Sequence, residues 1–114
     1  MFRTAIVCMS DKGAKGERED LSTKVIEKII IENGYKVTKK ILIPDEFELI
    51  KETLKNICDN DEADLILTTG GTGFSKRDVT PEATLEIIDK AAPGIPEAIR
   101  AYSMTITKRA MLSR

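Results

Sequence analysis

Glycines, hydroxyls and charged side chains gather between residues 68 and 80 of this sequence. The run Gly-Gly-Thr-Gly at 70–73 directly follows an apolar segment. Glycine adopts positive φ angles readily and lets backbone N–H groups approach a ligand closely, an arrangement that suits phosphate oxygens. Around these glycines stand four hydroxyls and two cations, on Thr68, Thr69, Thr72, Ser75, Lys76 and Arg77. Together these groups indicate a loop that binds an anion.

A tight turn without any ligand would use the same glycines, and this alternative stays open. The run fits neither the P-loop pattern G-x-x-x-x-G-K-[ST] nor the dinucleotide pattern G-x-G-x-x-G, so both of those assignments fail. Thr80, Pro81 and Glu82 predict a helix start, with the threonine hydroxyl as N-cap and proline at the first helical position. The positive end of that helix would point toward the loop, which favours the anion-binding interpretation.

Two aspartates are candidates for the chemistry, Asp45 after a predicted strand and Asp78 in the glycine-rich segment. Asp45 alone is best interpreted as a helix N-cap, worth about 1 kcal/mol. It could instead face Asp78 across a crevice. Two carboxylates near bound phosphates attract Mg²⁺, which prefers hard oxygen ligands, whereas an isolated pair could divide into acid and base roles. The neighbouring phosphate loop favours the metal.

The apolar pattern predicts strands over residues 4–9, 35–43 and 65–69, each rich in β-branched side chains. Helical spacing predicts a helix from Leu21 to an αL cap at Gly34, one over 47–57, one from Thr80 and one from 97 toward 108. Residues 10–20, with two glycines and no apolar period, are expected to form a loop. At its ends, Ser10 and Asp11, and Asp20 and Ser22, could hold polar ligand atoms, although such residues are commonly caps and turns.

Strands that alternate with helices predict an α/β fold with a parallel sheet and helices on both faces. Ligands on such sheets bind beyond the carboxyl ends of the strands. Residues 10–20, 44–45 and 70–80 should therefore converge there. Three strands are few for this class, so we expect either that the sequence is a fragment or that its sheet edge is completed elsewhere.

The composition excludes several function classes. The 114 residues carry 18 basic and 19 acidic side chains, which argues against a nucleic-acid partner, and the few aromatic residues offer no base-stacking platform. Histidine is absent, which removes the commonest general base and zinc ligand. No apolar run is long enough to span a membrane, and no secretory signal is evident. Cys8 and Cys58 are expected to be reduced core residues, which suggests the cytoplasm.

Residues 65–84, LILTTGGTGFSKRDVTPEAT, resemble the signature of the MogA/MoaB family of molybdenum-cofactor biosynthesis proteins. Further matches span nearly the whole chain: Ser10-Asp11, Ile-Pro-Asp-Glu at 43–46, Pro93-Gly94 and Met-Leu-Ser-Arg at 111–114. The Ile-Pro-Asp-Glu and Thr-Thr-Gly-Gly-Thr-Gly segments lean toward the MogA branch.

The resemblance implies a three-layer α/β/α fold with a mostly parallel sheet, in which residues 1–114 form one molybdopterin-binding domain. It further implies a C-terminal strand and an Asn-Leu-Pro-Gly-like loop that this chain lacks, a homotrimer, and hand-over of the product to a molybdate-inserting protein. The implied activity is transfer of AMP from Mg-ATP to molybdopterin, with release of pyrophosphate.

The family's two functional aspartates fall on Asp45 and Asp78, as catalytic residues and Mg²⁺ ligands. The residues implied to bind substrate are Ser10, Thr69, Gly70, Gly71, Thr72, Gly73 and Ser113. Two alternatives remain open. The first is a non-catalytic molybdopterin-binding or scaffold module, and the second is a sugar- or nucleotide-phosphate-binding domain, as in the related competence/damage-inducible proteins.

Overall fold

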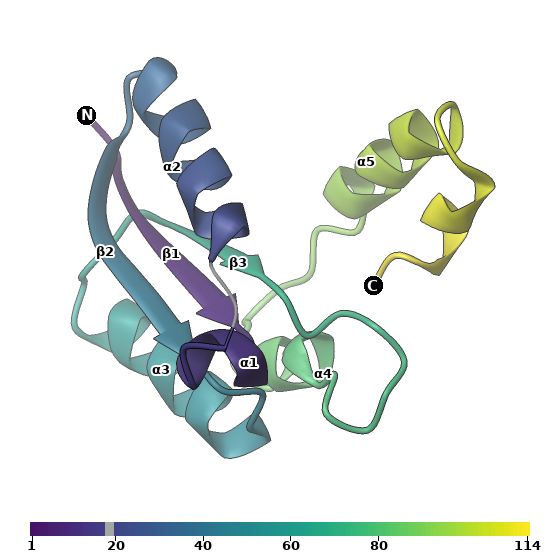
Figure 1. Cartoon of the computed structure of the whole chain (residues 1–114). Coiled ribbons are helices and arrows are strands. Elements are labelled where there is room, and N and C mark those ends of the chain that lie inside the picture. The colour runs from purple at the N-terminus through teal and green to yellow at the C-terminus, as the bar shows by residue number, and fades with distance from the viewer. Residues whose placement is uncertain (18–19) are drawn as a thin grey trace.

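A parallel sheet forms the centre of the structure, a computed structural model that describes residues 1–17 and 20–114 (Figure 1). Within these residues the sheet has three strands, β1 (Arg3–Met9), β2 (Lys36–Ile43) and β3 (Leu65–Thr69), in the order β2-β1-β3. Both pairs are parallel. The three predicted strands and their parallel pairing are confirmed, and their carboxyl ends meet at one edge of the sheet.

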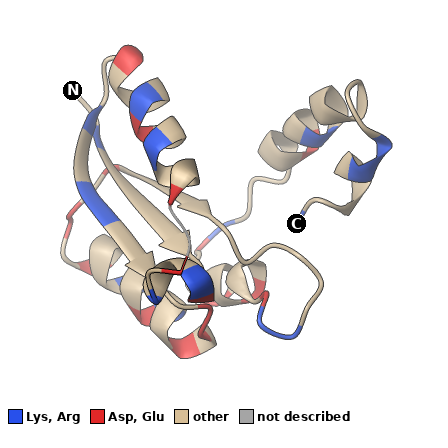
Figure 2. Ribbon diagram, viewed as in Figure 1, with Lys and Arg blue, Asp and Glu red and all other residues tan. Residues whose placement is uncertain are grey.

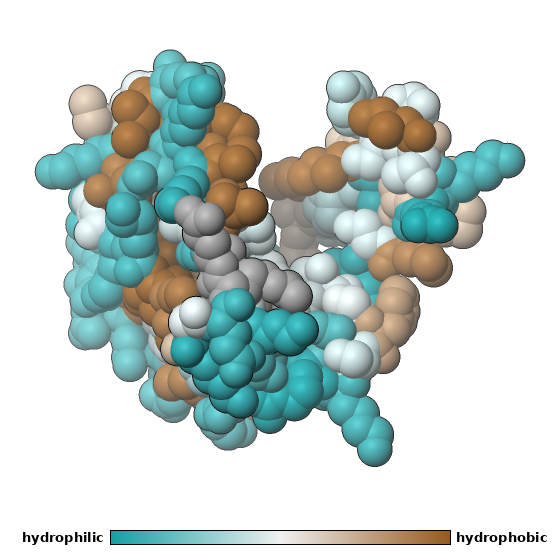
Figure 3. Space-filling model, viewed as in Figure 1, coloured by the Kyte–Doolittle hydropathy of each residue, from teal (hydrophilic) through white to brown (hydrophobic). Residues whose placement is uncertain are grey.

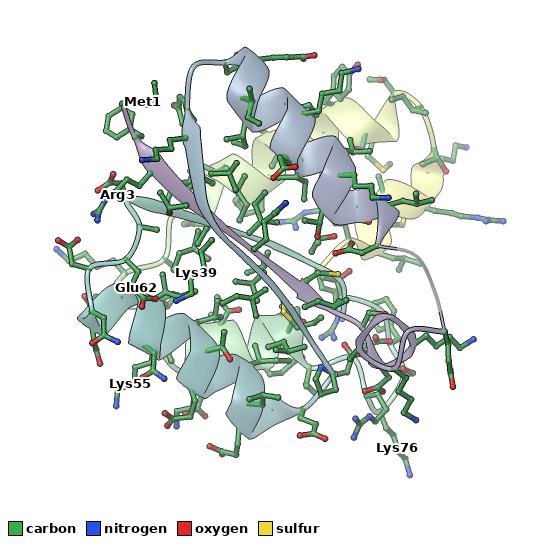
Figure 4. All side chains as sticks on the ribbon, turned by 60° about the vertical axis from the view of Figure 1, so that its left-hand side comes forward. Met1, Arg3, Lys39, Lys55, Glu62 and Lys76 are labelled. Carbon is green, nitrogen blue, oxygen red and sulfur yellow. The ribbon has the colours of Figure 1, made fainter. Side chains whose placement is uncertain are left out.

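Helices cover both faces of the sheet, which confirms the predicted three-layer α/β/α arrangement. The α2 helix (Leu21–Glu32) packs on one face of β1 and β2. On the other face lie α3 (Phe47–Asp59) and α4 (Thr80–Leu85) (Figure 4). The main core joins Ala5, Val7 and Met9 of β1 to side chains of α3 and α4, namely Ile50, Leu54, Ile57 and Ala83. Because β1 is covered on both faces, its sequence is a continuous apolar run.

The loop predicted over residues 10–20 contains a short helix, α1 (Asp11–Ala14). The prediction was wrong there because α1 is fixed by a cap and not by apolar spacing: the Ser10 Oγ accepts the Gly13 N–H at 3.0 Å. Residues 18 and 19 of the expected loop lie outside the described residues. The Asp20 carboxylate caps α2 by accepting the Thr23 N–H at 3.1 Å. Gly34 follows α2 with a φ of 80°, which confirms the predicted αL position.

The last predicted helix begins earlier and ends earlier than expected. The α5 helix spans Gly94–Met104, and a 3₁₀ helix, η1 (Lys108–Leu112), follows it. Pro96 lies in the first turn of α5, where a proline is tolerated because the first N–H groups of a helix have no partner. Thr105 directly follows the last residue of α5, and its hydroxyl donates to the Tyr102 carbonyl in the last turn at 2.6 Å.

The α5 helix stands apart from the sheet and buries none of its residues (Figure 1). Apolar side chains repeat along it and remain exposed: Ile95, Ile99 and Tyr102, followed by Ile106. A second exposed row lies on α2 at Leu21, Val25 and Ile29. Figure 3 shows hydrophobic side chains on the side of α2 that faces α5, and on α5 itself.

Basic and acidic residues are interspersed along the described elements (Figure 2), in keeping with the even charge balance. No helix within residues 1–17 and 20–114 has the length and apolar content needed to cross a membrane.

A salt-bridge cluster holds the start of β1 against the turn before β3. The Arg3 guanidinium donates to Asp64 Oδ1 at 3.0 Å and Oδ2 at 3.2 Å, and also to Asp61 Oδ1 at 2.9 Å. The Arg3 backbone N–H donates to Asp64 Oδ2 at 2.9 Å. These hydrogen bonds favour the ionised form of Asp64 and lower its pKa from 3.8 to about 2.

We therefore expect the Asp64 carboxyl to titrate with a midpoint near pH 2 in the folded protein. Because the folded pKa lies below the unfolded one, this carboxylate stabilises the fold above about pH 4, and the contribution disappears as the pH falls toward 2. Carboxyl ¹³C shifts followed by NMR measure the midpoint, with Asp64→Asn to assign the signal. A midpoint near 4 would contradict the structural account of this cluster.

Candidate functional site

A cavity of about 390 Å³ opens at the carboxyl ends of the three strands. The segments that were predicted to converge do meet here. Its lining includes the end of β1, the start of α2, the residue after Pro44, and the loop after β3. These residues are Cys8, Met9, Ser10, Gly13, Asp20, Leu21, Ser22, Leu42, Asp45, Thr69, Gly70, Gly71 and Asp78.

Two glycines shape the wall of this cavity where β3 ends. Gly70 has a φ of 91° and Gly71 a φ of 66°, both in the region that L side chains rarely adopt. A Cβ on Gly70 would overlap the carbonyl oxygen of Met9, and one on Gly71 would overlap the Thr80 hydroxyl. The glycines therefore let the backbone turn tightly against the end of β1, and expose it to the cavity.

Asp78 presents an ionised carboxylate to the same cavity. Its Oδ2 accepts two hydrogen bonds from Ser75, from the hydroxyl at 2.7 Å and from the backbone N–H at 3.1 Å. These bonds lower the pKa of Asp78 below its ordinary value. A Cβ on Gly73 would lie only 2.6 Å from Asp78 Oδ2. The absence of a side chain at Gly73 therefore lets the carboxylate occupy this position.

Asp45 does not cap α3, although the sequence favoured that role. The N-cap of α3 is Glu46, which makes no side-chain cap bond. Asp45 instead forms a reciprocal pair with Asp11, since the Asp11 N–H donates to Asp45 Oδ2 and the Asp45 N–H donates to Asp11 Oδ1, both at 2.9 Å. A spacing pattern cannot reveal this, because the competing donor lies 34 residues away.

The second carboxylate oxygen of Asp45 remains free within the described part of the chain. Oδ1 is buried, has no hydrogen-bond partner there, and would lie 2.9 Å from a Cβ on Gly71. Burial raises the pKa of Asp45, the Asp11 N–H lowers it, and the charges of Asp11 and Asp78 raise it again. Of the two predicted catalytic carboxylates in the cavity, Asp45 therefore has a raised pKa and Asp78 a lowered one. Asp20, the third carboxylate of the lining, also has a lowered pKa, because the effect of its burial, which raises the pKa, is outweighed by hydrogen bonding, chiefly from Thr23.

The prediction that Thr80 is the N-cap of the helix was also wrong, because the cap lies one residue earlier. Val79 is the N-cap of α4, because its carbonyl already accepts the Ala83 N–H at 2.9 Å. Thr80 is instead the first helical residue, and its N–H donates to the Gly71 carbonyl at 3.1 Å. Its hydroxyl is buried beside Gly71 without a partner among the described residues. Thr80 was not among the predicted site residues, since its hydroxyl was assigned to the cap.

Six of the nine predicted site residues line the cavity, and three do not. Thr72 and Gly73 lie farther along the loop, where their carbonyls accept the Arg114 Nε–H at 3.2 Å and 3.0 Å. Ser113 lies after η1, and its carbonyl accepts a hydrogen bond from Arg100 at 3.2 Å. The residues that meet are Ser10, Asp45, Thr69, Gly70, Gly71 and Asp78.

The two cations of the loop do not line this cavity. Lys76 points away from the molecule (Figure 4). Arg77 forms a two-point ion pair with Asp11, through Nε to Oδ2 at 2.9 Å and Nη2 to Oδ1 at 2.8 Å. The sequence offered no signal for this pair, because the partners are 66 residues apart.

The carboxylates can hold a metal ion only together with other ligands. No group of three or more histidine, cysteine or acidic side chains is placed to bind a metal ion within residues 1–17 and 20–114. Mg²⁺ is usually bound through one or two carboxylates plus substrate phosphates and water. Asp45 and Asp78, with the buried unpartnered Oδ1 of Asp45, fit that type of donor set.

The two cysteines differ in their surroundings. Cys8 is buried, and burial raises the pKa of its thiol to about 11, with a further contribution from the charge of Asp20. Cys58 is exposed on α3, so the expectation that both cysteines are core residues was wrong for Cys58.

We expect iodoacetamide at neutral pH to modify Cys58 readily and Cys8 only after unfolding, because the thiolate is the reactive form. Mass spectrometry of the native protein should show one adduct, and Cys58→Ser should abolish it. Rapid labelling of Cys8 in the folded protein would contradict its burial.

Together these features define an α/β domain with a cavity at the carboxyl ends of its parallel strands, lined by glycine backbone and by carboxylates. The chain belongs to the family described as the probable molybdopterin binding domain, whose model matches residues 5–114. The resemblance found in the sequence is therefore confirmed at the level of the family.

Individual relatives agree with this assignment. The chain is 40% identical over 112 residues to the molybdopterin adenylyltransferase of Helicobacter pylori strain J99, covering 96% of this chain and 63% of that protein. It is 36% identical over 116 residues to the Escherichia coli K12 protein of the same name, covering 99% and 59%. The solved molybdopterin biosynthesis enzyme MoaB from Thermus thermophilus superposes with a TM-score of 0.92 at 43% identity, covering 100% and 72%. The chain thus spans about three fifths of the length of these curated relatives.

Proposed function

We propose that this chain is the molybdopterin-binding part of a molybdopterin adenylyltransferase, which transfers AMP from ATP to molybdopterin. The main support is one arrangement: the half-buried glycines Gly70 and Gly71 line the same cavity as the Asp45 and Asp78 carboxylates. Curated relatives at 36–40% identity carry the name of this activity.

In the proposed reaction, an oxygen of the terminal phosphate of molybdopterin attacks the α-phosphorus of ATP. A new P–O bond forms as the bond from the α-phosphorus to the bridging oxygen breaks, and pyrophosphate leaves with that electron pair. The attacking phosphate is already ionised at neutral pH, so the absence of histidine is no obstacle. The protein must mainly position the two substrates and neutralise their charge.

The loop after β3 supplies the binding groups in this proposal. We propose that backbone N–H groups at Gly70 and Gly71 hold the phosphate of molybdopterin, because both glycines line the cavity and have no side chain to keep a ligand away from the backbone. The full set of proposed substrate-binding residues is Ser10, Thr69, Gly70, Gly71, Thr72, Gly73 and Ser113.

Asp45 and Asp78 are the proposed catalytic residues and would hold Mg²⁺ together with the phosphates of ATP. When bound, Mg²⁺ neutralises charge on the transferring phosphates. Asp78 is kept ionised by the two Ser75 hydrogen bonds, and Asp45 offers its unpartnered Oδ1. Both features support the metal-binding role.

The assembly is also a proposal. We propose a cytoplasmic homotrimer that passes its product to a molybdate-inserting protein. The exposed apolar rows on α2 and α5 support contacts with further protein surface. Light scattering of the complete protein measures the oligomeric state.

A non-catalytic molybdopterin-binding module would use the same loop, so turnover must be measured directly. The complete protein that carries this chain is incubated with molybdopterin and Mg-ATP. Release of pyrophosphate, together with a pterin product heavier by one AMP, supports the proposal. Tight molybdopterin binding without pyrophosphate would favour the binding module, and no molybdopterin binding would favour a different phosphate ligand.

A further inference from the structure

The Asp45 carboxylate is held in place by a chain of contacts that begins outside the cavity. Asp45 Oδ2 is fixed by the Asp11 N–H, while Asp11 Oδ1 accepts the Asp45 N–H, both at 2.9 Å. With Oδ2 engaged in this way, Oδ1 is the oxygen turned toward Gly71. The orientation of Asp45 therefore depends on the position of Asp11.

Asp11 is in turn held by Arg77, a residue of the glycine-rich loop. The guanidinium donates to both carboxylate oxygens of Asp11, at 2.8 and 2.9 Å. This planar, two-point geometry is available to arginine but not to lysine. Arg77 also supplies positive charge beside two neighbouring carboxylates. Without that charge, the repulsion between Asp11 and Asp45 would act to open the reciprocal pair.

Arg77 reaches this pair from outside the substrate cavity. Neither Arg77 nor Asp11 lines the cavity that contains Gly70, Gly71 and Asp78. Both face a separate depression that is also lined by Pro44 and Glu46. The Arg77 side chain is 57% exposed, so it contributes no core packing of its own. Its contacts link the loop after β3 to the ends of β1 and β2.

We propose that Arg77, acting through Asp11, is a positioning residue for the Asp45 carboxylate, and that it tunes metal-dependent AMP transfer without touching the substrates. The expected effect on turnover rests on the proposed function, whereas the expected effect on the position of Asp45 does not. Residues that orient metal ligands typically contribute about 10- to 100-fold to metal affinity or activity. The expected effect of losing Arg77 is thus a higher Mg²⁺ requirement.

The structural test uses Arg77→Met and follows amide hydrogen exchange by NMR. We expect the Asp11 and Asp45 amides to lose protection by about 10-fold or more, while amides of β1 and α3 keep theirs. Arg109→Met is the matched control, because Arg109 is exposed and its guanidinium has no partner in the described part of the chain. Unchanged protection at both amides in Arg77→Met would overturn the proposal, whether or not the protein is an adenylyltransferase.

The kinetic test is a double-mutant cycle in the complete protein, with Arg77→Met, Asp11→Asn and the pair. Each single variant should raise the Mg²⁺ concentration for half-maximal turnover about 10-fold and leave the KM for molybdopterin within about 2-fold. The double variant should be no worse than either single one, since both remove the same linkage. Arg77→Lys should recover only part of the loss.

The outcomes separate the proposals. If the two single effects multiply in the double variant, Arg77 acts independently of Asp11 and the positioning role is wrong. A rise in the KM for molybdopterin alone would make Arg77 a substrate contact, which also overturns it. If the wild-type protein makes no pyrophosphate, the proposed function fails, and the amide-exchange result alone decides the positioning role.

Discussion

Asp78→Asn is expected to lower the rate of AMP transfer by at least about 100-fold, while molybdopterin binding changes little. The substitution keeps the size of the side chain and its ability to accept from Ser75, but removes the charge that would hold Mg²⁺ beside the ATP phosphates. Losing one preorganised electrostatic group at a transferring centre commonly costs about 100- to 1,000-fold in rate. Pyrophosphate release at saturating substrates measures this effect.

Asp89→Asn is the matched control for Asp78→Asn. It removes one carboxylate from an exposed position that does not line the cavity, so turnover should stay within about 2-fold of wild type. Molybdopterin binding, measured by fluorescence titration, should be retained in both variants. Unchanged turnover in Asp78→Asn would remove Asp78 from the proposed chemistry.

Gly71→Ala is expected to weaken molybdopterin binding by at least about 10-fold, an energy of about 1.4 kcal/mol. The added methyl group would meet the Thr80 hydroxyl and Asp45 Oδ1, on a backbone whose φ of 66° already disfavours alanine. The backbone must therefore shift at the point where its N–H groups are proposed to hold the phosphate. A titration with molybdopterin measures the loss.

Gly34→Ala separates the effect on the site from the cost of backbone strain. Gly34 has a comparable φ of 80°, but a Cβ there would meet nothing within 4 Å. Alanine at this position should cost about 1–2 kcal/mol of stability and leave molybdopterin binding unchanged. Equal binding losses in both variants would show that general destabilisation, and not the geometry of the loop, explains the result.

The layers of the fold could be predicted because each depends on a local pattern. The β-branched run of β1, the helical spacing in α2 and α3, and the αL glycine at Gly34 are all readable over a few residues. The same reasoning missed α1, whose four residues have no apolar period. It also set α5 too late, because a proline in the first turn does not prevent a helix from starting before it.

The site could be predicted only in part, because several of its contacts join residues distant in the sequence. The glycine-rich turn and the convergence of Asp45 with Asp78 follow from strand order. The partner of Asp45 does not follow from strand order. A carboxylate just before a helix has the spacing of an N-cap, and only the folded chain brings the Asp11 N–H close enough to bind this carboxylate instead. The sequence analysis likewise assigned Arg77 to the anion-binding loop. Its actual partner, Asp11, lies 66 residues away and cannot be identified from the local pattern.

The most direct test of the account is a crystal structure of the protein with molybdopterin bound. We predict that the pterin phosphate lies within hydrogen-bond distance of the backbone N–H groups at Gly70 and Gly71, in the cavity lined by Asp45 and Asp78. Molybdopterin bound at any other surface, with this loop unoccupied, would contradict the proposed function and leave only the family and the fold.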